Sequence, residues 1–165
     1  MGTSIGPAID YLIAGTNPVT GTTLMTDLFT ADATITLVDG IASSISQSMV
    51  FIGKATPDSL STQTGSQQLL VLGAGRSQEE YDIPCFVYAY RPGPKIKPAR
   101  DAAIALFDAV AHWVAADRTL GGILLQGRIA EITNVELDQS IDGESGALCI
   151  VSLRFTIHCR NHYIP

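Results

Sequence analysis

Residues 97–117 read KPARDAAIALFDAVAHWVAAD, and this stretch decides the fold together with the segment that follows it as far as His158. Pro98 fits the first turn of a helix, where its missing N–H costs nothing. Apolar residues then recur at helical spacing and predict one broad apolar face. That face consists of Ile104, Phe107, Ala111 and Val114, widened by Leu106, Val110 and Trp113.

Residues 148–160 (LCIVSLRFTIHCR) alternate with a period of two, which is typical of a strand with one buried face. The apolar set is Cys149, Val151, Leu153, Phe155, Ile157 and Cys159, and the opposite set is Ser152, Arg154, Thr156, His158 and Arg160. Residues 126–137 predict the preceding strand, and 142–146 (DGESG) predict the turn between the two. Because the helix and the hairpin each have one apolar face, we expect them to bury each other.

The first half of the chain adds shorter elements. Residues 4–14 predict a helix capped by Ser4, residues 24–29 a short turn, and three further strands are expected at 34–38, 48–54 and 81–91. Pro84 predicts that the last of these strands lies at an edge or contains a bulge. The expected fold is α+β, a mostly antiparallel sheet with a main helix and a short N-terminal helix packed on it.

Residues 56–80 differ from the rest, because they are rich in Ser, Thr, Gln and Gly. A connection of this length inside a compact domain is usually functional or flexible. We therefore expect a long projecting loop or hairpin arm, attached to a single domain that spans residues 1–165. Its one apolar patch consists of Leu69, Leu70, Val71 and Leu72 and is a candidate contact with a neighbouring molecule.

The composition favours assembly. Charged residues make up 16% of the chain, against roughly 25% in ordinary soluble domains, and the mean hydropathy is +0.25. No apolar run approaches the roughly 18 residues of a membrane helix, and the first residues do not read as a signal peptide. A permanent oligomer would cover the excess apolar surface, the alternative being a dense monomer core with uncharged loops. The net charge of −6 argues against a protein that coats nucleic acid.

Four patterns could carry chemistry, and each has a simpler interpretation. Residues 73–78 (GAGRSQ) begin like a dinucleotide loop but lead into a strand. Ser145 lies in a hairpin turn rather than a nucleophile elbow. His158 and Cys159 point to opposite faces of a strand, with His162 in a terminal tail, which argues against a zinc site. Asp108 and His112 form a lone pair on the helix.

The sequence therefore predicts no catalytic, cofactor-binding or metal-binding residues. Cys85, Cys149 and Cys159 lie in apolar strand settings and are expected to be reduced and buried. The expected function lies in surfaces rather than in chemistry.

Two patches of opposite charge stand out. The basic patch surrounds the start of the main helix, where positive charge is slightly unfavourable with the helix dipole, and it consists of Arg91, Lys95, Lys97 and Arg100. The acidic patch follows the last hairpin and consists of Glu131, Glu136, Asp138, Asp142 and Glu144. The basic patch indicates an acidic partner surface or DNA, and a solvated face is the alternative. Together the two complementary patches are candidates for a head-to-tail contact between subunits.

Taken together, these residues resemble the tail terminator (tail completion) family of long-tailed phages and related gene transfer agents. The likeness covers roughly residues 5–160. In the first half it rests on Asp39-Gly40 and Phe51-Ile52-Gly53, each after a strand, followed by a variable arm and an aromatic strand. In the second half it rests on Ala99-Arg100-Asp101, on Asp117-Arg118-Thr119-Leu120-Gly121-Gly122, and on the return strand Val151-Ser152-Leu153-Arg154-Phe155.

The resemblance implies a structural virion subunit that is not an enzyme and needs no cofactor. It would form a hexameric ring at the head-proximal end of the tail, made in the host cytoplasm. The ring would cap the tail tube, end tube polymerisation and meet the head–tail connector or neck, while DNA passes through its lumen without specific binding and no membrane is involved. The arm would contact the tube or a neighbouring subunit.

The sequence leaves two alternative hypotheses open. One is another head–tail connector, a neck protein or a tail tube subunit. The other is a small cytosolic α+β enzyme or ligand-binding module, which would need convergent polar groups such as Asp108, His112 and Arg154.

Overall fold

The computed structural model of the chain describes residues 3–39, 46–54, 64–71, 76–124, 129–142 and 148–163, with the side chains of 64–71, 76–77, 142 and 162–163 left out. In chain order its elements are α1 (Ile5–Ala14), α2 (Leu24–Ala31), β1 (Ile35–Asp39), β2 (Ser48–Ile52), β3 (Thr64–Val71), β4 (Arg76–Pro92), α3 (Lys97–Ala116), β5 (Ala130–Asp142) and β6 (Leu148–Tyr163).

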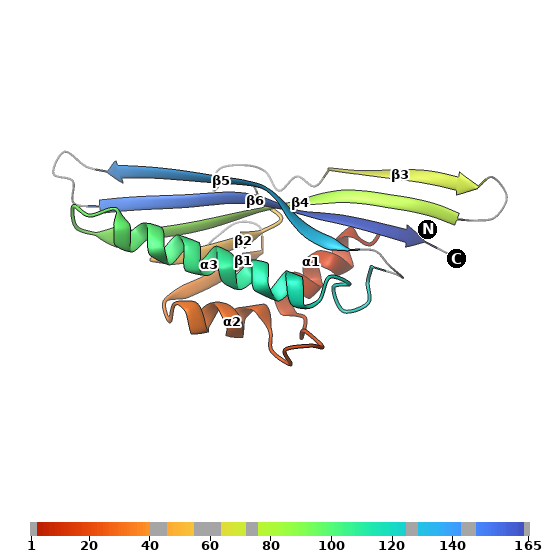
Figure 1. Cartoon of the computed structure of the whole chain (residues 1–165), viewed down its shortest axis with the longest axis horizontal. Coiled ribbons are helices and arrows are strands. Elements are labelled where there is room, and N and C mark those ends of the chain that lie inside the picture. Colours follow the sequence, from red (N-terminus) through yellow and green to blue (C-terminus); the bar gives the residue numbers. More distant parts are fainter. Residues whose placement is uncertain are drawn as a thin grey trace.

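The strands form one sheet in the order β1-β2-β4-β6-β5, and β3 also pairs with β4. All described pairings are antiparallel except β1 with β2. The three helices lie together on one side of this sheet, and its other side carries none of them (Figure 1). The predicted α+β class is confirmed.

The last hairpin supplies two long strands. The apolar set of β6 is buried and the opposite set is not, as the alternation predicts. β5 begins at Ala130 and ends at Asp142, so it lies later in the chain than the predicted 126–137. A bulge between Thr133 and Glu136, with Asn134 at φ 53°, interrupts its pairing with β6. This bulge explains why the sequence of β5 lacks regular alternation.

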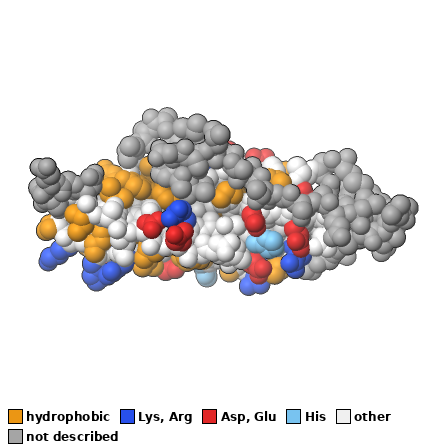
Figure 2. Space-filling model, turned by 90° about the horizontal axis from the view of Figure 1, so that it is seen from above, with side chains coloured by type: hydrophobic (Ala, Val, Ile, Leu, Met, Phe, Trp, Pro, Cys, Tyr) orange, Lys and Arg blue, Asp and Glu red, His pale blue; other side chains and the backbone are white. Residues whose placement is uncertain are grey.

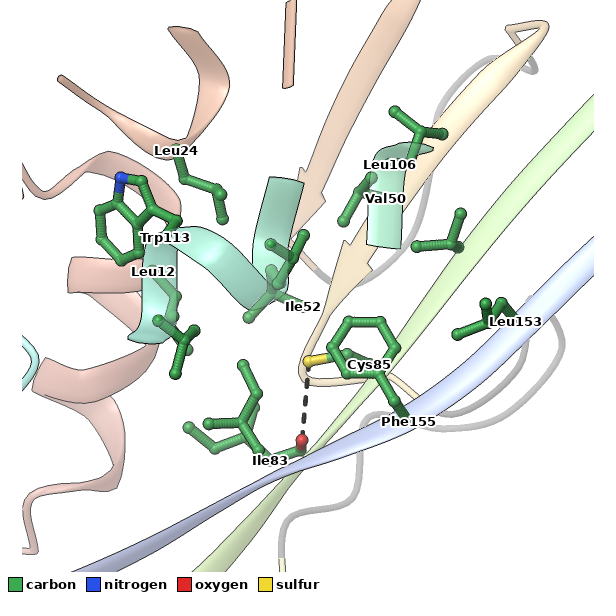
Figure 3. Packing of buried hydrophobic residues seen from close by; sticks show 14 of the residues in the cluster. Leu12, Leu24, Val50, Ile52, Ile83, Cys85, Leu106, Trp113, Leu153 and Phe155 are labelled. Carbon is green, nitrogen blue, oxygen red and sulfur yellow. Dashed lines mark hydrogen bonds between the residues drawn. The ribbon is translucent and has the colours of Figure 1, made fainter. Parts of the chain in front are cut away.

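Helix α3 packs against β4, β5 and β6 and carries the centre of the core (Figure 3). Its buried residues are Ala99, Ala103, Leu106, Val110, Trp113 and Val114. The buried face is therefore rotated from the predicted one, and Ile104, expected in the stripe, is 38% exposed. Small Ala99 and Ala103 let the first turns of the helix lie close to the sheet, which an apolar pattern alone does not reveal.

The described part of the predicted arm belongs to the sheet. β3 pairs with the first half of β4, and that same half pairs with β6 on its other side. A projecting arm is thus not confirmed. Residues 55–63 and 72–75 lie outside the described residues, and so do Leu72 and the Gly73–Gly75 part of the supposed dinucleotide loop.

Pro84 lies inside an interior strand, so β4 is not the predicted edge. On one side β4 is paired with β6 throughout. On the other side, among the described residues, the pairing with β2 ends at Cys85 and the pairing with β3 begins at Asp82. Pro84 therefore occupies a local gap in the ladder, where a missing N–H is tolerated.

The N-terminal helices follow the expected pattern with two differences. Ser4 lies at the N-cap position of α1, but its hydroxyl donates to Glu79 (2.7 Å) instead of capping the helix. Residues 24–31 form a full helix, α2, rather than the turn expected at 24–29, and the Thr23 side chain accepts from Thr26 N. Leu12, Leu24 and Leu28 bring both helices into the core.

The turn after α3 is organised by a buried carboxylate. Asp117 accepts hydrogen bonds from Thr119 N (3.1 Å), Thr119 Oγ1 (2.6 Å), Gly121 N (2.6 Å) and the Tyr11 hydroxyl (2.7 Å). Burial alone would raise the pKa of Asp117, but these hydrogen bonds lower it overall. The turn thereby places Leu120, at φ 49°, fully inside the core.

Candidate interaction surface

The β5 edge is the first part of the candidate surface. Among the described residues β5 pairs with no strand except β6, and beyond Ala130, whose N–H donates to Arg118 O (2.8 Å), its other side has no strand partner. Three of its apolar side chains are exposed: Val135 by 52%, Leu137 by 39% and Ile141 by 56%. An edge strand of 13 residues with exposed apolar side chains is a ready site for pairing with another chain.

The register shows which way these side chains point. Leu137 lies opposite Leu153, and Ile141 lies opposite Cys149. Directly paired residues share a face of the sheet, so Leu137 and Ile141 face the helix side but extend beyond the cover of α3. We name the pair Leu137 and Ile141 the apolar strip.

The outer face of the same strands is charged (Figure 2). Arg154 pairs with Glu136 (3.3 Å) and Asp138 (2.5 Å), which joins β6 to β5. These side chains are 36%, 63% and 53% exposed, so the pairs contribute little to stability. Two of the acidic residues predicted for a subunit contact therefore already have a partner within the subunit.

A second polar group lies farther along this face. His158 Nδ1 is 2.7 Å from Asp82 Oδ1, and Arg160 Nε donates to Glu80 Oε1 (2.6 Å). The hydrogen bond from Arg160 is the main reason that the pKa of Glu80 lies below its ordinary value. Glu131, which is exposed, lies opposite His158 on β5.

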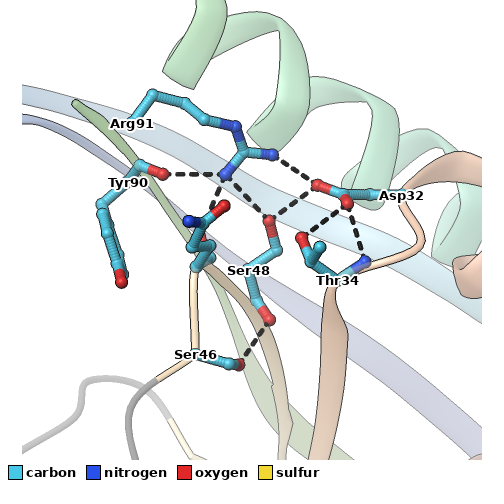
Figure 4. Close-up of polar contacts among 7 residues, drawn as sticks. Asp32, Thr34, Ser46, Ser48, Tyr90 and Arg91 are labelled. Carbon is cyan, nitrogen blue, oxygen red and sulfur yellow. Dashed lines mark hydrogen bonds and ion pairs between the residues drawn. The ribbon is translucent and has the colours of Figure 1, made fainter. Parts of the chain in front are cut away.

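Arg91 is not a free surface cation (Figure 4). Its guanidinium pairs with Asp32 and donates to Ser48 Oγ (3.2 Å) and to the backbone oxygens of Gln47 and Tyr90. Burial would raise the pKa of Asp32, but hydrogen bonds from Thr34 and Ser48 and the charge of Arg91 lower it to about 2. This network ties the end of α2 to β2 and β4, so Arg91 serves the fold.

The rest of the basic patch is more accessible. Lys97 is 71% exposed and pairs with Asp101 one turn later, Lys95 is exposed, and Arg100 is half-buried. The Asp142 end of the acidic patch lies at the same end of the sheet as the basic patch, because Leu148 is opposite Pro92 on one side and Asp142 on the other, whereas Glu131 lies at the far end of β5. A head-to-tail contact between these two patches stays a prediction, with Lys95, Lys97 and Arg100 as its basic half.

Some predicted residues fall outside what the structure describes. Glu144 and Ser145 lie in residues 143–147, and the side chains of Asp142 and His162 are not described. The backbone of Leu69, Leu70 and Val71 lies in β3, but their side chains are not described either. Their role as a contact stays a prediction.

The alternative chemical site is not assembled. Asp108 and His112 are exposed on α3, whereas Arg154 lies on the outer face of the sheet, the side away from the helices. Within the described residues no group of three or more His, Cys, Asp or Glu side chains could hold a metal ion. The three cysteines are free and buried, and burial raises the pKa of the Cys85 and Cys159 thiols to about 12.

The residues of the apolar strip were not predicted as a surface. Leu137 was placed at the end of its strand and Ile141 beyond that end. A usable signal was present in residues 136–142 (ELDQSID), where acidic and apolar side chains alternate, a pattern typical of an exposed edge.

No protein-family model matches the chain, and no curated protein sequence matches it. Among solved structures, the chain is similar to a chain from the virion of a native gene transfer agent particle. That similarity covers 87% of this chain and 98% of the other, with 13% sequence identity and a TM-score of 0.43. At these values the likeness says nothing about individual residues or function. None of the helices in the described part of the chain combines the length and apolar character needed to cross a membrane.

Proposed function

We propose that this chain is a structural virion subunit of the tail terminator type, a single domain that assembles with copies of itself into a ring. The observation that carries the proposal is the apolar strip along the open edge of β5. Apolar side chains beside unpaired strand groups are unfavourable in water and are stabilised when another chain covers them. A subunit that acts by assembly needs such a surface.

The specific role comes from the resemblance of the sequence to tail terminators, and the structure gives physical reasons for the residues that carry it. The 117–122 segment forms the turn that locks α3 to α1, with Asp117 and Leu120 buried. Val151, Leu153 and Phe155 form the helix-facing side of β6. These residues build the scaffold of the subunit.

In this role the ring, six subunits in the family, caps the tail tube at the head-proximal end of the tail and meets the connector or neck. DNA passes through its lumen. The net charge of −6 suits such a passage, because exposed Lys and Arg lining it would hold the phosphates. A neck protein and a tube subunit are the alternatives within this class.

Sizing chromatography and negative-stain imaging of the purified chain test the proposal, alone and with tail tube subunits of the same virion. We expect closed rings from the chain alone, and tubes that stop growing once they carry the ring. Long tubes formed by the chain alone would instead identify a tube subunit. A chain that stays monomeric even with tubes present would contradict the proposal.

A further inference from the structure

Within the described part of the chain, the sheet has an open edge on each of its two sides. β4 pairs with β6 along its whole length, so β2 and β3 must both occupy the other side of β4. β5 is the last described strand of the sheet on the side of β6. Within the described residues β5 and β3 each have one partner strand, which leaves one long edge of each unpaired, on opposite sides of the sheet.

The β5 edge has a part without the usual protection against pairing. Natural edges are blunted by bulges, Pro or charged side chains, Lys above all. The bulge of β5 ends at Glu136, and residues 136–142 continue in regular register with no Pro and no Lys. The acidic Glu136 and Asp138 side chains are drawn to Arg154 on the outer face. An approaching strand therefore meets seven regular residues flanked by the apolar strip.

The β3 strand of another copy matches this edge. β3 has eight residues, TGSQQLLV. None of them is charged, so β3 would bring no negative charge close to Glu136 and Asp138 of β5. The pairings also fix its direction: β3 and β6 both run antiparallel to β4, and β5 runs antiparallel to β6. β3 is thus antiparallel to β5, so a neighbouring sheet in the same orientation would add β3 as an antiparallel strand.

The other available edges fit less well. β1 has only five residues and ends at Asp39. Two β5 strands paired about Gln139 would place Glu136 of each copy opposite Asp142 of the other, and like charges directly opposite are destabilising. That arrangement also closes as a dimer, whereas contact between two different edges can close as a ring.

We infer that residues 136–142 of β5 pair with β3 of a second copy of this chain, so that the sheet continues from one subunit to the next. The inference rests on the proposed function, for which it supplies the subunit contact. β3 aligns with the Arg76–Asp82 half of β4, whereas residues 136–142 align with the Phe86–Pro92 half. Each copy is therefore displaced along the strands relative to the one before, as strands in closed sheets are tilted.

Cross-linking of the full-length chain tests the contact. Gln139 is exposed on β5, so Gln139→Cys is combined in one chain with Gln67→Cys or, because neighbouring residues of a strand face opposite ways, with Ser66→Cys. Because the native cysteines are buried, the wild-type chain serves as the control for background cross-linking. After treatment with a short bismaleimide, we expect a ladder of covalent oligomers from one of the two pairs.

The matched control is Val19→Cys combined with Gln139→Cys, because Val19 is 70% exposed but lies in the loop before α2. It is expected to give no ladder. Dimers from Gln139→Cys alone would favour symmetric pairing of two β5 strands and overturn the inference. Rings that form without a ladder from either β3 pair would overturn the inference and leave the ring proposal standing. A ladder without rings would support the β5–β3 contact and overturn the proposal of a ring.

Substitution gives an independent readout. Leu137→Lys and Ile141→Lys each place on the open edge the residue that natural edges use against pairing. Both positions are partly exposed, so the subunit should still fold. We expect about tenfold weaker assembly for each, equivalent to ~1.4 kcal/mol, measured as the protein concentration at half-assembly. Val19→Lys should leave assembly unchanged, and equal weakening by all three substitutions would count against a contact at β5.

Discussion

The 117–122 turn and the β5 edge both place acidic groups beside apolar side chains. The two regions differ in the partners that these acidic groups have. In the turn, Asp117 is 6% exposed and accepts four hydrogen bonds from within the subunit. On the edge, Glu136 and Asp138 are mostly exposed and share one Arg154. The turn uses its polar groups to fix the fold, and the edge keeps both polar and apolar groups accessible.

The difference follows from where α1 and α3 meet. Tyr11 of α1 contacts Trp113 of α3 at 5.0 Å between ring centroids, and its hydroxyl donates to Asp117. Buried Asn17 donates to the Trp113 carbonyl (2.9 Å) and accepts from Val19 N and Thr20 N. The polar groups at the end of α3 are thus supplied from the N-terminal segment. β5 has no such neighbour among the described residues, and we expect a second copy to supply it.

Asp117→Ala should give the largest effect in this comparison. It removes a buried carboxylate and the four hydrogen bonds that this carboxylate accepts from Thr119, Gly121 and Tyr11, which together hold the turn. We expect a loss of about 3 kcal/mol in the free energy of unfolding, measured by urea denaturation. Asp101→Ala is the control, because the pair of Asp101 with Lys97 is exposed and should contribute less than about 0.5 kcal/mol. Similar losses of unfolding free energy from both substitutions would mean that the hydrogen bonds of Asp117 do not stabilise the turn.

Gly121→Ala should follow, with a loss of about 2–3 kcal/mol. Gly121 has φ 70°, and an added Cβ would lie 2.6 Å from Tyr11 Cε2, so both backbone strain and a clash oppose the substitution. Gly122 has φ 84° but no atom within 4 Å of an added Cβ. Gly122→Ala should therefore cost only about 1 kcal/mol of strain. Thermal or urea unfolding of the two variants separates these causes, and equal losses would show that the contact with Tyr11 does not matter.

The Asp32–Arg91 network extends the comparison to pH. The pKa of Asp32 is lowered from 3.8 to about 2, so its contribution is present above pH ~4 and is lost as the pH falls through about 2. The shift corresponds to about 2 kcal/mol at neutral pH. In urea titrations over this range, the difference between wild type and Asp32→Asn should shrink toward low pH. A difference that stays constant would show that the ionised form of Asp32 adds no stability through its hydrogen bonds with Thr34 and Ser48 and its pair with Arg91.

The features predicted best from the sequence are those that follow from a regular repeat of apolar residues within one helix or strand. The buried set of β6 was correct because a period of two directly encodes which residues share a face. The buried face of α3 was placed less accurately, because Ile104 and Leu106 are equally apolar and only the sheet below decides which one it covers. The existence of five of the described strands and of the main helix could therefore be predicted, whereas β3 was expected only as part of a loop or hairpin arm and the centre of the helix face was misplaced.

Contacts between distant segments could not be predicted. Arg91 was grouped with Lys95 and Lys97, its neighbours in sequence, but its partner Asp32 is 59 residues away. Glu79 similarly accepts from Ser4, 75 residues away. The candidate surface was missed for a related reason: Ile141 is apolar like a core residue, and only the position of β5 at the edge of the sheet leaves it exposed.

Arg154→Ala should give the smallest effect on the subunit, and it examines the exposed side of the comparison. Its pairs with Glu136 and Asp138 are solvent-exposed, so we expect a loss of about 0.5 kcal/mol in unfolding free energy, which high ionic strength should remove. Without Arg154, however, two carboxylates on the β5 edge lose their counter-charge. If that edge receives a second copy, assembly should weaken more than folding does, and added salt should restore it. Sizing at low and high ionic strength measures this, and a variant that assembles like wild type at low salt would show that Arg154 does not prepare the edge for a partner strand.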